Sequence, residues 1–303
     1  MKIIPTSSKV GIIFVKRGDI RFDFPDIMAM EVGKYVDSFV KWLLQNFSPL
    51  FDAISSGSMW ILLRFEGLLY WLPWWIFLLL ILLISWKVKN LLSGLVFALL
   101  VFIIGLLGLW NLMIQTLAIV LTSVIISLFI GVPIGILMTY SNRVSNIIKP
   151  LLDAMQTMPS FVYLIPAIML FRLGKVPAVF ATIVYAIPPV IRLTDLGIRR
   201  VPREMVEAAH SFGSSSWQTL LKVQIPQALP TIMTGINQTT MMALAMVVIA
   251  SMVGAPGLGM EVLIAVSQID IARGFEAGIS IVFLAIIIDR LSQGIAEKFK
   301  YPE

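Results

Sequence analysis

The sequence predicts an all-α polytopic membrane protein with about seven transmembrane helices. Hydrophobic residues make up 58% of the 303 positions and charged residues only 13%, whereas about 25% charged residues is usual in a soluble domain. The apolar residues gather in long runs, and a hydrocarbon core of about 30 Å needs about 20 of them per helix. The runs predict spans at residues 67–86, 91–110, 112–140, 150–171, 176–193, 230–254 and 277–296.

An amphipathic helix is predicted before the spans, at about residues 31–47. Its apolar residues repeat at helical spacing on one face, and Glu31, Lys34 and Asp37 are among the residues of the other face. Such a helix either lies in the outer leaflet, where it would be placed to meet a partner protein, or packs on the helix bundle. The spacing alone leaves both interpretations open.

The ends of the spans are marked by tryptophan and by basic residues. The tryptophans typical of interfacial belts are Trp71, Trp74, Trp75 and Trp86. The basic residues that share one side of the membrane are Lys87, Lys89, Arg143, Lys149, Lys298 and Lys300. Because basic residues are retained in the cytoplasm, this bias predicts an N-terminus outside and a C-terminus inside.

A polar island interrupts the apolar runs at residues 203–230. Pro202 suits the first turn of a helix, and Gly213 is expected to end that helix. Apolar residues at helical spacing on the two sides of Gly213 are Met205, Ala208, Ala209, Phe212, Trp217, Leu220 and Leu221. Pro226 and Pro230 are expected to stop the second helix. Two short helices that meet at a glycine elbow and expose apolar stripes predict a docking element rather than a solvated loop without a partner.

The island also carries a family pattern. The order is Glu207-Ala208-Ala209, three residues, Gly213, nine residues, then Val223-Gln224-Ile225-Pro226. It resembles the EAA loop of ABC-importer permeases, whose usual ending I-x-L-P differs at Val223 and Ile225 while keeping apolar character. The blocks that resemble the glycine betaine/proline-type quaternary amine permeases of this superfamily are residues 151–166, 184–198, 236–259 and 286–293.

The resemblance implies the fold of a type I ABC importer transmembrane domain. The permease core would occupy residues 112–296, with a cytoplasmic coupling loop at 194–229. An extracytoplasmic tail at 1–66 and accessory transmembrane helices at 67–111 would precede the core, and a cytoplasmic tail at 297–303 would follow it.

The resemblance also implies partners. The chain has no P-loop pattern, so ATP and Mg would be bound by a separate P-loop ATPase, and no cofactor by this chain. Since one EAA loop serves one ATPase subunit, two ATPase copies and a homodimer of this chain are expected, together with an extracytoplasmic substrate-binding protein and the bilayer, and no nucleic acid. In the coupling loop, Ala208 and Ala209 would permit close approach, Glu207 would pair with a basic residue, Gly213 would form the elbow and Pro226 would set the return angle.

Polar and flexible residues in the last spans are candidates for the translocation path. Asn237, Gln238, Thr239 and Thr240 form a dense polar group, and Met242 and Met246 with their neighbour Met241 would supply flexible gate material. Interhelical hydrogen bonding is an equally good interpretation of the polar group. The same two interpretations apply to Asp153, Gln156 and Thr157, with packing or capping favoured. Asp289 and Arg290 are expected to pair internally.

A sharp break in the chain is predicted at residues 254–259. Its turn-forming residues are Gly254, Pro256, Gly257 and Gly259. The turn follows from composition. The resemblance implies that this segment lies by the outer gate, where a binding protein would deliver substrate.

The resemblance implies uptake of a betaine-like, osmoprotective compatible solute across the bacterial inner membrane. Glycine betaine and proline betaine are the first candidate solutes, and choline, carnitine and trimethylamine N-oxide are the alternatives. An ion-coupled secondary transporter would carry ionisable residues at mid-membrane, where this sequence has few. An intramembrane enzyme would need catalytic or metal-binding side chains, but the chain has no cysteine, and His210 is its one histidine. A transport subunit without enzymatic or metal sites is therefore expected.

Overall fold

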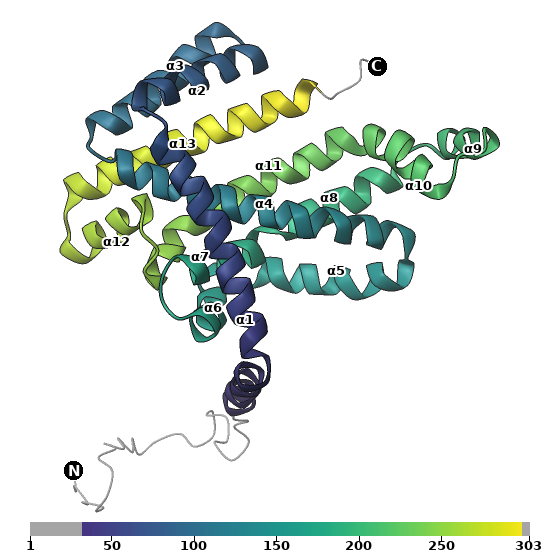
Figure 1. Ribbon diagram of the computed structural model, residues 1–303, viewed down its shortest axis with the longest axis horizontal. Coiled ribbons are helices and arrows are strands. Elements are labelled where there is room, and N and C mark those ends of the chain that lie inside the picture. Colours follow the sequence, from purple (N-terminus) through teal and green to yellow (C-terminus); the bar gives the residue numbers. More distant parts are fainter. Residues whose placement is uncertain (1–31, 299–303) are drawn as a thin grey trace, which may run out of the picture. The chain divides into compact units, whose positions relative to one another are not determined.

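The computed structural model describes residues 32–298, and every regular element in that range is a helix. The chain divides into two compact units, with the boundary between Leu43 and Leu44. All residues discussed below from α2 onward belong to the second unit, and Figure 1 shows its helices. The predicted all-α class is confirmed for the part of the chain that the structure describes.

Helix α1 (Val32–Trp71) is longer than the amphipathic helix predicted at residues 31–47. Phe47 has φ −121° and ψ 18°, which are not helical values, and Pro49 follows two residues later. A proline donates no backbone hydrogen bond and its ring crowds the preceding turn, so the helix is kinked here without ending. Glu31, the first residue of the predicted range, lies outside the described residues.

The predicted span at residues 67–86 is not one continuous helix. Its first residues belong to α1, and the rest belong to α2 (Trp74–Val88), which is bent by 101° from α1. Pro73, at the corner, has φ −55° and ψ 144°. Apolar residues lie on both sides of the corner, so the composition of the run conceals it.

Helix α3 (Leu91–Leu106) has 16 residues and ends before the predicted limit at residue 110. The side chain of Asn90 caps it by accepting a hydrogen bond from the Ser93 N–H at 2.8 Å. At 1.5 Å per residue the helix is about 24 Å long, less than the hydrocarbon thickness of about 30 Å. It packs closely along α2, where a Cβ on Gly94 would lie 2.8 Å from the carbonyl oxygen of Leu82.

Four helices pack together at the centre of the second unit. They are α4 (Trp110–Tyr140), α7 (Lys175–Ala186), α8 (Pro188–Arg199) and α11 (Ile225–Ala250). Helix α8 packs against both α4 and α11 (Figure 1). The predicted span at 112–140 is α4, and the span at 176–193 is α7 with the first part of α8, which begins at its two prolines.

The predicted span at residues 150–171 is broken in two. Helix α5 (Asn142–Thr157) is followed by the short helix η2 (Ser160–Tyr163) and by α6 (Leu164–Phe171), after a bend of 111°. Met158, which follows α5, has φ −69° and ψ 135°, because the residue before a proline is disfavoured in the helical region, and so the helix ends before Pro159.

The coupling-loop helices lead into α11 without a stop. They are α9 (Arg203–Ser211), α10 (Ser216–Thr219) and a π-helical turn, η3 (Leu220–Gln224). The prediction that Pro226 and Pro230 end the second helix is wrong, because both lie in α11 and the helical backbone continues from Ser216 to Val253. In the π turn the Ile225 N–H donates to the carbonyl oxygen of Leu220, and this wider turn accommodates the missing donor of the proline that follows.

The chain ends in η4 (Ser251–Val253), α12 (Leu258–Gln268) and α13 (Ile271–Lys298), and α13 packs against α11 and α12. By length and composition, the described residues form four helices that can cross a membrane, or up to six if each bent pair is one span. The sequence predicts about seven. Of the predicted spans, α3 is too short to be counted, and those at 67–86 and 150–171 count only if each bent pair is one span.

Candidate functional site

The bend between α9 and α10 lies at Gly213, the residue that the sequence predicts to end the first of these helices. Gly213 has φ 81°. Its N–H donates to the carbonyl oxygen of His210 at 2.9 Å, and the Ser214 N–H donates to that of Ala209 at 3.1 Å, which satisfies carbonyls at the end of α9. Nothing lies within 4 Å of the position that a Cβ would occupy. The glycine is therefore required by the backbone conformation and not by lack of space.

The two loop helices present an exposed surface beyond the ends of α8 and α11 (Figure 1). Helix α9 has no buried residue. Glu207 and Ala208 are exposed and Ala209 is half-buried. Phe212 is 92% exposed and Trp217 is 65% exposed. Large apolar side chains gathered on two short exposed helices are typical of a surface that binds another protein.

The second loop helix is fixed by a capping box. The Gln218 N–H donates to Oγ of Ser215 at 3.3 Å, and the Ser215 N–H donates to Oε1 of Gln218 at 2.9 Å. One turn later, Leu220 is 1% exposed and packs in a small apolar core with Ile198 and Ile232. The helix thus stands on a packed base while its outer face stays open.

The predicted residues Val223, Ile225 and Pro226 lie beneath this exposed surface. All three are half-buried, in the π turn and the first turn of α11. Ile225 packs against the apolar core below the loop, and the neighbouring Gln224 accepts a hydrogen bond from Oη of Tyr140 at 2.8 Å. These residues join the loop to α4 and α8 rather than forming its outer face.

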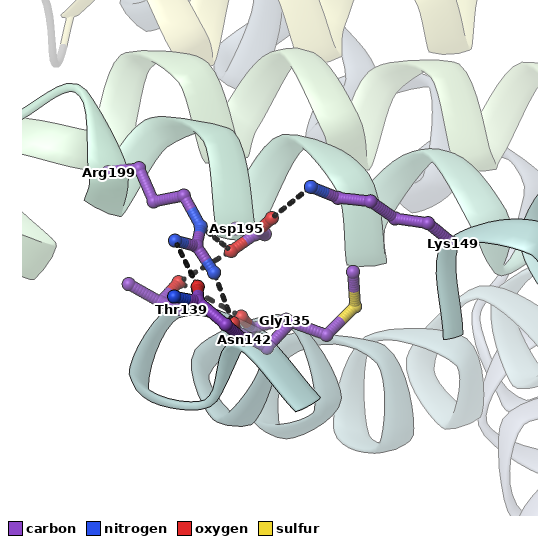
Figure 2. Close-up of polar contacts among 7 residues, drawn as sticks. Gly135, Thr139, Asn142, Lys149, Asp195 and Arg199 are labelled. Atoms are coloured by element: carbon purple, nitrogen blue, oxygen red, sulfur yellow. Dashed lines mark hydrogen bonds and ion pairs between the residues drawn. The ribbon is translucent and has the colours of Figure 1, made fainter. Parts of the chain in front are cut away.

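A polar cluster around Asp195 lies at the base of the loop (Figure 2). Asp195 is only 4% exposed. Its Oδ1 accepts hydrogen bonds from Nε of Arg199 at 2.6 Å and from Oγ1 of Thr139 at 3.0 Å. Its Oδ2 lies 4.0 Å from Nζ of Lys149. One carboxylate therefore connects α8 with α4 and α5.

Arg199 extends the cluster to the end of α4. Its Nη1 donates to Oδ1 of Asn142 at 3.3 Å, and its Nη2 donates to the carbonyl oxygen of Met138. The last carbonyls of a helix have no partner within the helix, and a cation at that end is favourable. The guanidinium supplies both a donor and a positive charge there (Figure 2).

Close packing reinforces this base. A Cβ on Gly135 of α4 would lie 2.6 Å from Cβ of Thr194, and one on Gly235 of α11 would lie 2.9 Å from Cβ of Leu193. Both distances are shorter than real contacts allow, so only glycine lets α8 approach α4 and α11 this closely. The segment of α9 and α10 is therefore attached to three tightly packed helices.

Asp195 and Arg199 are not among the residues predicted to function. A local signal existed, because an acid and a base four residues apart on an apolar helix form an ion pair. Thr139, however, lies 56 positions from Asp195 in the sequence, and only the fold brings the two together.

The candidate path residues of α11 do not share one face. Nδ2 of Asn237 donates to Oδ1 of Asp289 in α13 at 3.1 Å, and Oδ1 of Asn237 accepts from Ser292. Gln238 is exposed, whereas Met246 is fully buried. The remaining two lie between these extremes: the hydroxyl of Thr240 bonds to the carbonyl of Ile236, and Met242 packs at the edge of the largest core.

The expected pairing of Asp289 with Arg290 is wrong. Oδ1 of Asp289 accepts from Asn237 and, at 2.7 Å, from Nε2 of Gln293. Arg290 is exposed and makes no ion pair among the described residues. Adjacent residues of a helix point in different directions, which explains why the neighbours do not meet. Asp153, by contrast, forms an ion pair with Arg192 of α8.

The predicted turn at residues 254–259 is present between η4 and α12. Gly254 has φ 82° and Gly257 has φ 133°, values that favour glycine. The Leu258 N–H donates to Oγ1 of Thr116 at 2.8 Å, and a Cβ on Gly259 would lie 2.8 Å from the carbonyl oxygen of Val247. Pro256 between them is half-buried. The segment is thus held tightly against α4 and α11.

Between residues 32 and 298, no group of three or more His, Cys, Asp or Glu side chains is arranged to hold a metal ion.

Relatives of this chain are membrane subunits of transport systems. The glycine betaine/carnitine transport permease protein GbuB of Listeria monocytogenes is 48% identical over 282 residues, which cover 91% of this chain and 99% of the relative. The glycine betaine transport system permease protein OpuAB of Bacillus subtilis is 48% identical, with 88% and 94% covered. The glycine betaine/proline betaine transport system permease protein ProW of Escherichia coli is 45% identical, with 87% and 75% covered.

Solved structures support the fold. An inward-facing structure of the MetNI methionine ABC transporter matches with a TM-score of 0.57 at 20% identity, covering 62% of this chain and 94% of the matched chain. This similarity concerns the fold alone, that of a type I ABC importer transmembrane domain.

A family model matches more than half of the chain, over residues 131–301. Its description is "Binding-protein-dependent transport system inner membrane component". The matched region contains the coupling loop, the Asp195 cluster and the turn at 254–259. The chain therefore belongs to the family of binding-protein-dependent transport system inner membrane components.

Proposed function

We propose that this chain is the permease subunit of an ATP-driven ABC importer for glycine betaine, proline betaine and similar compatible solutes. It is a transport subunit, and ATP and Mg belong to a separate ATPase. The observation that carries the proposal is the exposed pair of helices α9 and α10. Helix α9 has no buried residue, and the preceding end of α8 is fixed by the hydrogen bond between Arg199 and Asp195. The names of two relatives that are 48% identical, both of which include glycine betaine, support the substrate class.

The coupling loop would transmit ATP-driven movement into the membrane. Two copies of this chain would each bind one ATPase subunit on α9 and α10. A partner shifts a conformational equilibrium only through its different affinity for the two states. A change from mostly inward-facing to mostly outward-facing needs about 5.5 kcal/mol of such difference, which a large interface and ATP binding supply.

Individual loop residues would have separate roles in this interface. Ala208 and Ala209 have small side chains that permit close backbone approach by the ATPase. Glu207, exposed on the same helix, would pair with a basic residue of the ATPase. Gly213 sets the angle between the two helices, while Pro226, inside α11, would act through the π turn and not as a helix stop.

The proposed topology places the loop in the cytoplasm and the N-terminus outside. The bias of basic residues supports it. The turn at 254–259 then lies on the outer side, where a substrate-binding protein would deliver the solute. Residues 67–111 would be accessory to a permease core at 112–296, and the path would involve residues of α11 such as the exposed Gln238.

The solute itself has more than one candidate. One relative at 48% identity has a name that includes carnitine, and a trimethylamine N-oxide permease of Pelagibacter ubique is 34% identical. Glycine betaine is common to the names of the three relatives compared above. Glycine betaine is therefore our first choice and carnitine the second.

The test is a pull-down of the tagged chain from its native membranes in mild detergent, followed by mass spectrometry and uptake assays. A stoichiometric P-loop ATPase is expected, and Ala208→Glu or Gly213→Asp should remove it. The matched control is Gly278→Ala, at a helical position with nothing within 4 Å of a Cβ. Retention of the ATPase by the loop variants, or uptake that persists without any ATPase, would contradict the proposal.

A further inference from the structure

The connection between α6 and α7 contains a strained residue. Arg172 has φ 65° and ψ −155°, a region that residues with a Cβ rarely occupy. Such a conformation is energetically unfavourable and persists only where the surroundings determine it. The Arg172 side chain is exposed, so contacts of the neighbouring residues must hold the backbone in place.

One contact joins this connection to the turn at 254–259. The Gly174 N–H donates to the carbonyl oxygen of Val253 at 2.9 Å. Val253 is the residue directly before Gly254, whose φ of 82° begins the turn. A movement of the α6–α7 connection therefore displaces the start of the proposed outer gate.

A second contact joins the connection to α1. Nζ of Lys175, the first residue of α7, donates to both carboxylate oxygens of Glu66, at 2.8 Å and 2.7 Å. The side chains of Glu66 and Lys175 are only 12% and 23% exposed. Removing one partner of an enclosed pair leaves the other charge without compensation, so the pair resists separation.

The Glu66 end of the pair is itself firmly held. Its neighbours on α1, Leu62 and Leu69, are 1% and 7% exposed and belong to the two largest apolar cores. Tyr70, in the next turn, donates from Oη to the carbonyl oxygen of Asn111 at 3.4 Å. This part of α1 is therefore a fixed point against which the α6–α7 connection is held.

We propose that Glu66 and Lys175 are positioning residues for the outer gate, through which α1 holds the gate segment in the conformation seen here. The chain of contacts runs from Glu66 to Lys175, to the Gly174 N–H and to Val253. The family model matches from residue 131, so Glu66 lies before the matched region and Lys175 lies inside it. The inference rests on the proposed function, because it needs the turn at 254–259 to be the outer gate.

Opening of this gate would require one of two changes. Either the Gly174–Val253 hydrogen bond breaks, or the connection moves and separates Lys175 from Glu66. Strain at Arg172 favours release once either contact is lost. The ion pair thus determines how readily the outer gate opens when no ATP drives the movement.

The experiment uses the absence of native cysteine in this chain. Met252→Cys places a reporter at a residue that is 60% exposed, directly before Val253. The whole transporter, with ATPase and binding protein, is labelled from outside with a membrane-impermeant thiol reagent. Glu66→Gln or Lys175→Met in this background should release the gate segment and so raise the labelling rate without ATP. The expected increase is roughly fivefold or more, the usual lower limit for coupled sites.

Two further variants separate positioning from general stability. Lys41→Gln breaks the exposed Lys41–Asp37 pair in the same helix and should label like the parent. The reversed pair, Glu66→Lys with Lys175→Glu, should restore parental labelling. Parental rates in both single variants would overturn the proposal, and so would a folded reversed pair that does not restore the rate.

The outcome is independent of the proposed substrate. If the parent complex imports glycine betaine and the single variants label like the parent, the proposed function stands and the inference fails. If the parent imports no betaine but labelling responds to Glu66→Gln, the substrate assignment fails while the tie between α1 and residue 253 is supported.

Discussion

Arg199 donates from Nε to Oδ1 of Asp195, one turn earlier in α8, at 2.6 Å. The same oxygen accepts from Thr139, and the same guanidinium donates to the carbonyl oxygen of Met138. The final turns of α4 and α8 are therefore joined immediately before α9 begins. A displacement of the loop must move both helices together.

Asp195→Asn should weaken this joint. The variant leaves Arg199 and Lys149 without their carboxylate, and because Arg199 is partly exposed, water offsets some of the loss. We expect destabilisation of about 1–3 kcal/mol, with a lower apparent Tm in detergent. The control is Asp153→Asn, which breaks an ion pair whose acid is 64% exposed and should cost about 0–1 kcal/mol. Equal losses in the two variants would contradict the role of burial.

Gly135→Ala should be severely destabilising. The new Cβ would lie 2.6 Å from Cβ of Thr194 and 2.7 Å from the carbonyl oxygen of Ile191, so α4 and α8 must separate. Overpacking of this kind costs about 1–3 kcal/mol. Gly278→Ala is the matched control in α13, where nothing lies within 4 Å and alanine favours the helix by up to about 1 kcal/mol. The two Tm values should move in opposite directions.

Gly213→Asp should leave insertion and folding intact while removing the ATPase and, with it, ATP-driven uptake. The site has open space for a side chain, but its φ of 81° is unfavourable for a residue with a Cβ. The strain of about 1–2 kcal/mol is expected to change the angle between α9 and α10. Membrane yield, ATPase retention and uptake are measured together. Normal uptake would rule out a coupling role for this elbow.

Asn237→Leu distinguishes the two interpretations of the polar group in α11. Its amide bonds to Asp289 and Ser292 of α13, which favours a structural role. The expected result is a small loss of stability, about 0.6 kcal/mol per hydrogen bond, with an unchanged KM for uptake. A raised KM with an unchanged Tm would instead identify Asn237 as a residue of the path.

Long uninterrupted apolar runs could be predicted well. The span at 112–140 corresponds to α4 because Pro133 is accommodated inside the helix. The corners at Pro73 and Pro159 escaped prediction, since neither proline changes the apolar composition around it. Pro226 and Pro230 predict the end of a helix, but a π turn lets the helix continue past them. A proline identifies a possible break, and tertiary packing decides whether it occurs.

Residues at turns could be predicted and residues in clusters could not. Gly213 and Gly254 were identifiable because a local backbone requirement leaves a local signal. Glu66 and Lys175 are 109 positions apart, and the composition around each gives no sign of the other. Pairing of this kind depends on the packing of helices, which one sequence does not specify.

The helix that continues from Ser216 to Val253 is long enough for a small tilt at one end to produce a large displacement at the other. Its 38 residues correspond to a rod about 57 Å long at the usual rise. The ATPase would act at one end of the rod, and Gly254 lies at the other. A tilt of about 10° around the inner end sweeps the outer tip through about 10 Å, a distance comparable to the diameter of a helix. In the proposed mechanism, a modest rotation at the end bound by the ATPase would open a passage wide enough for a small solute.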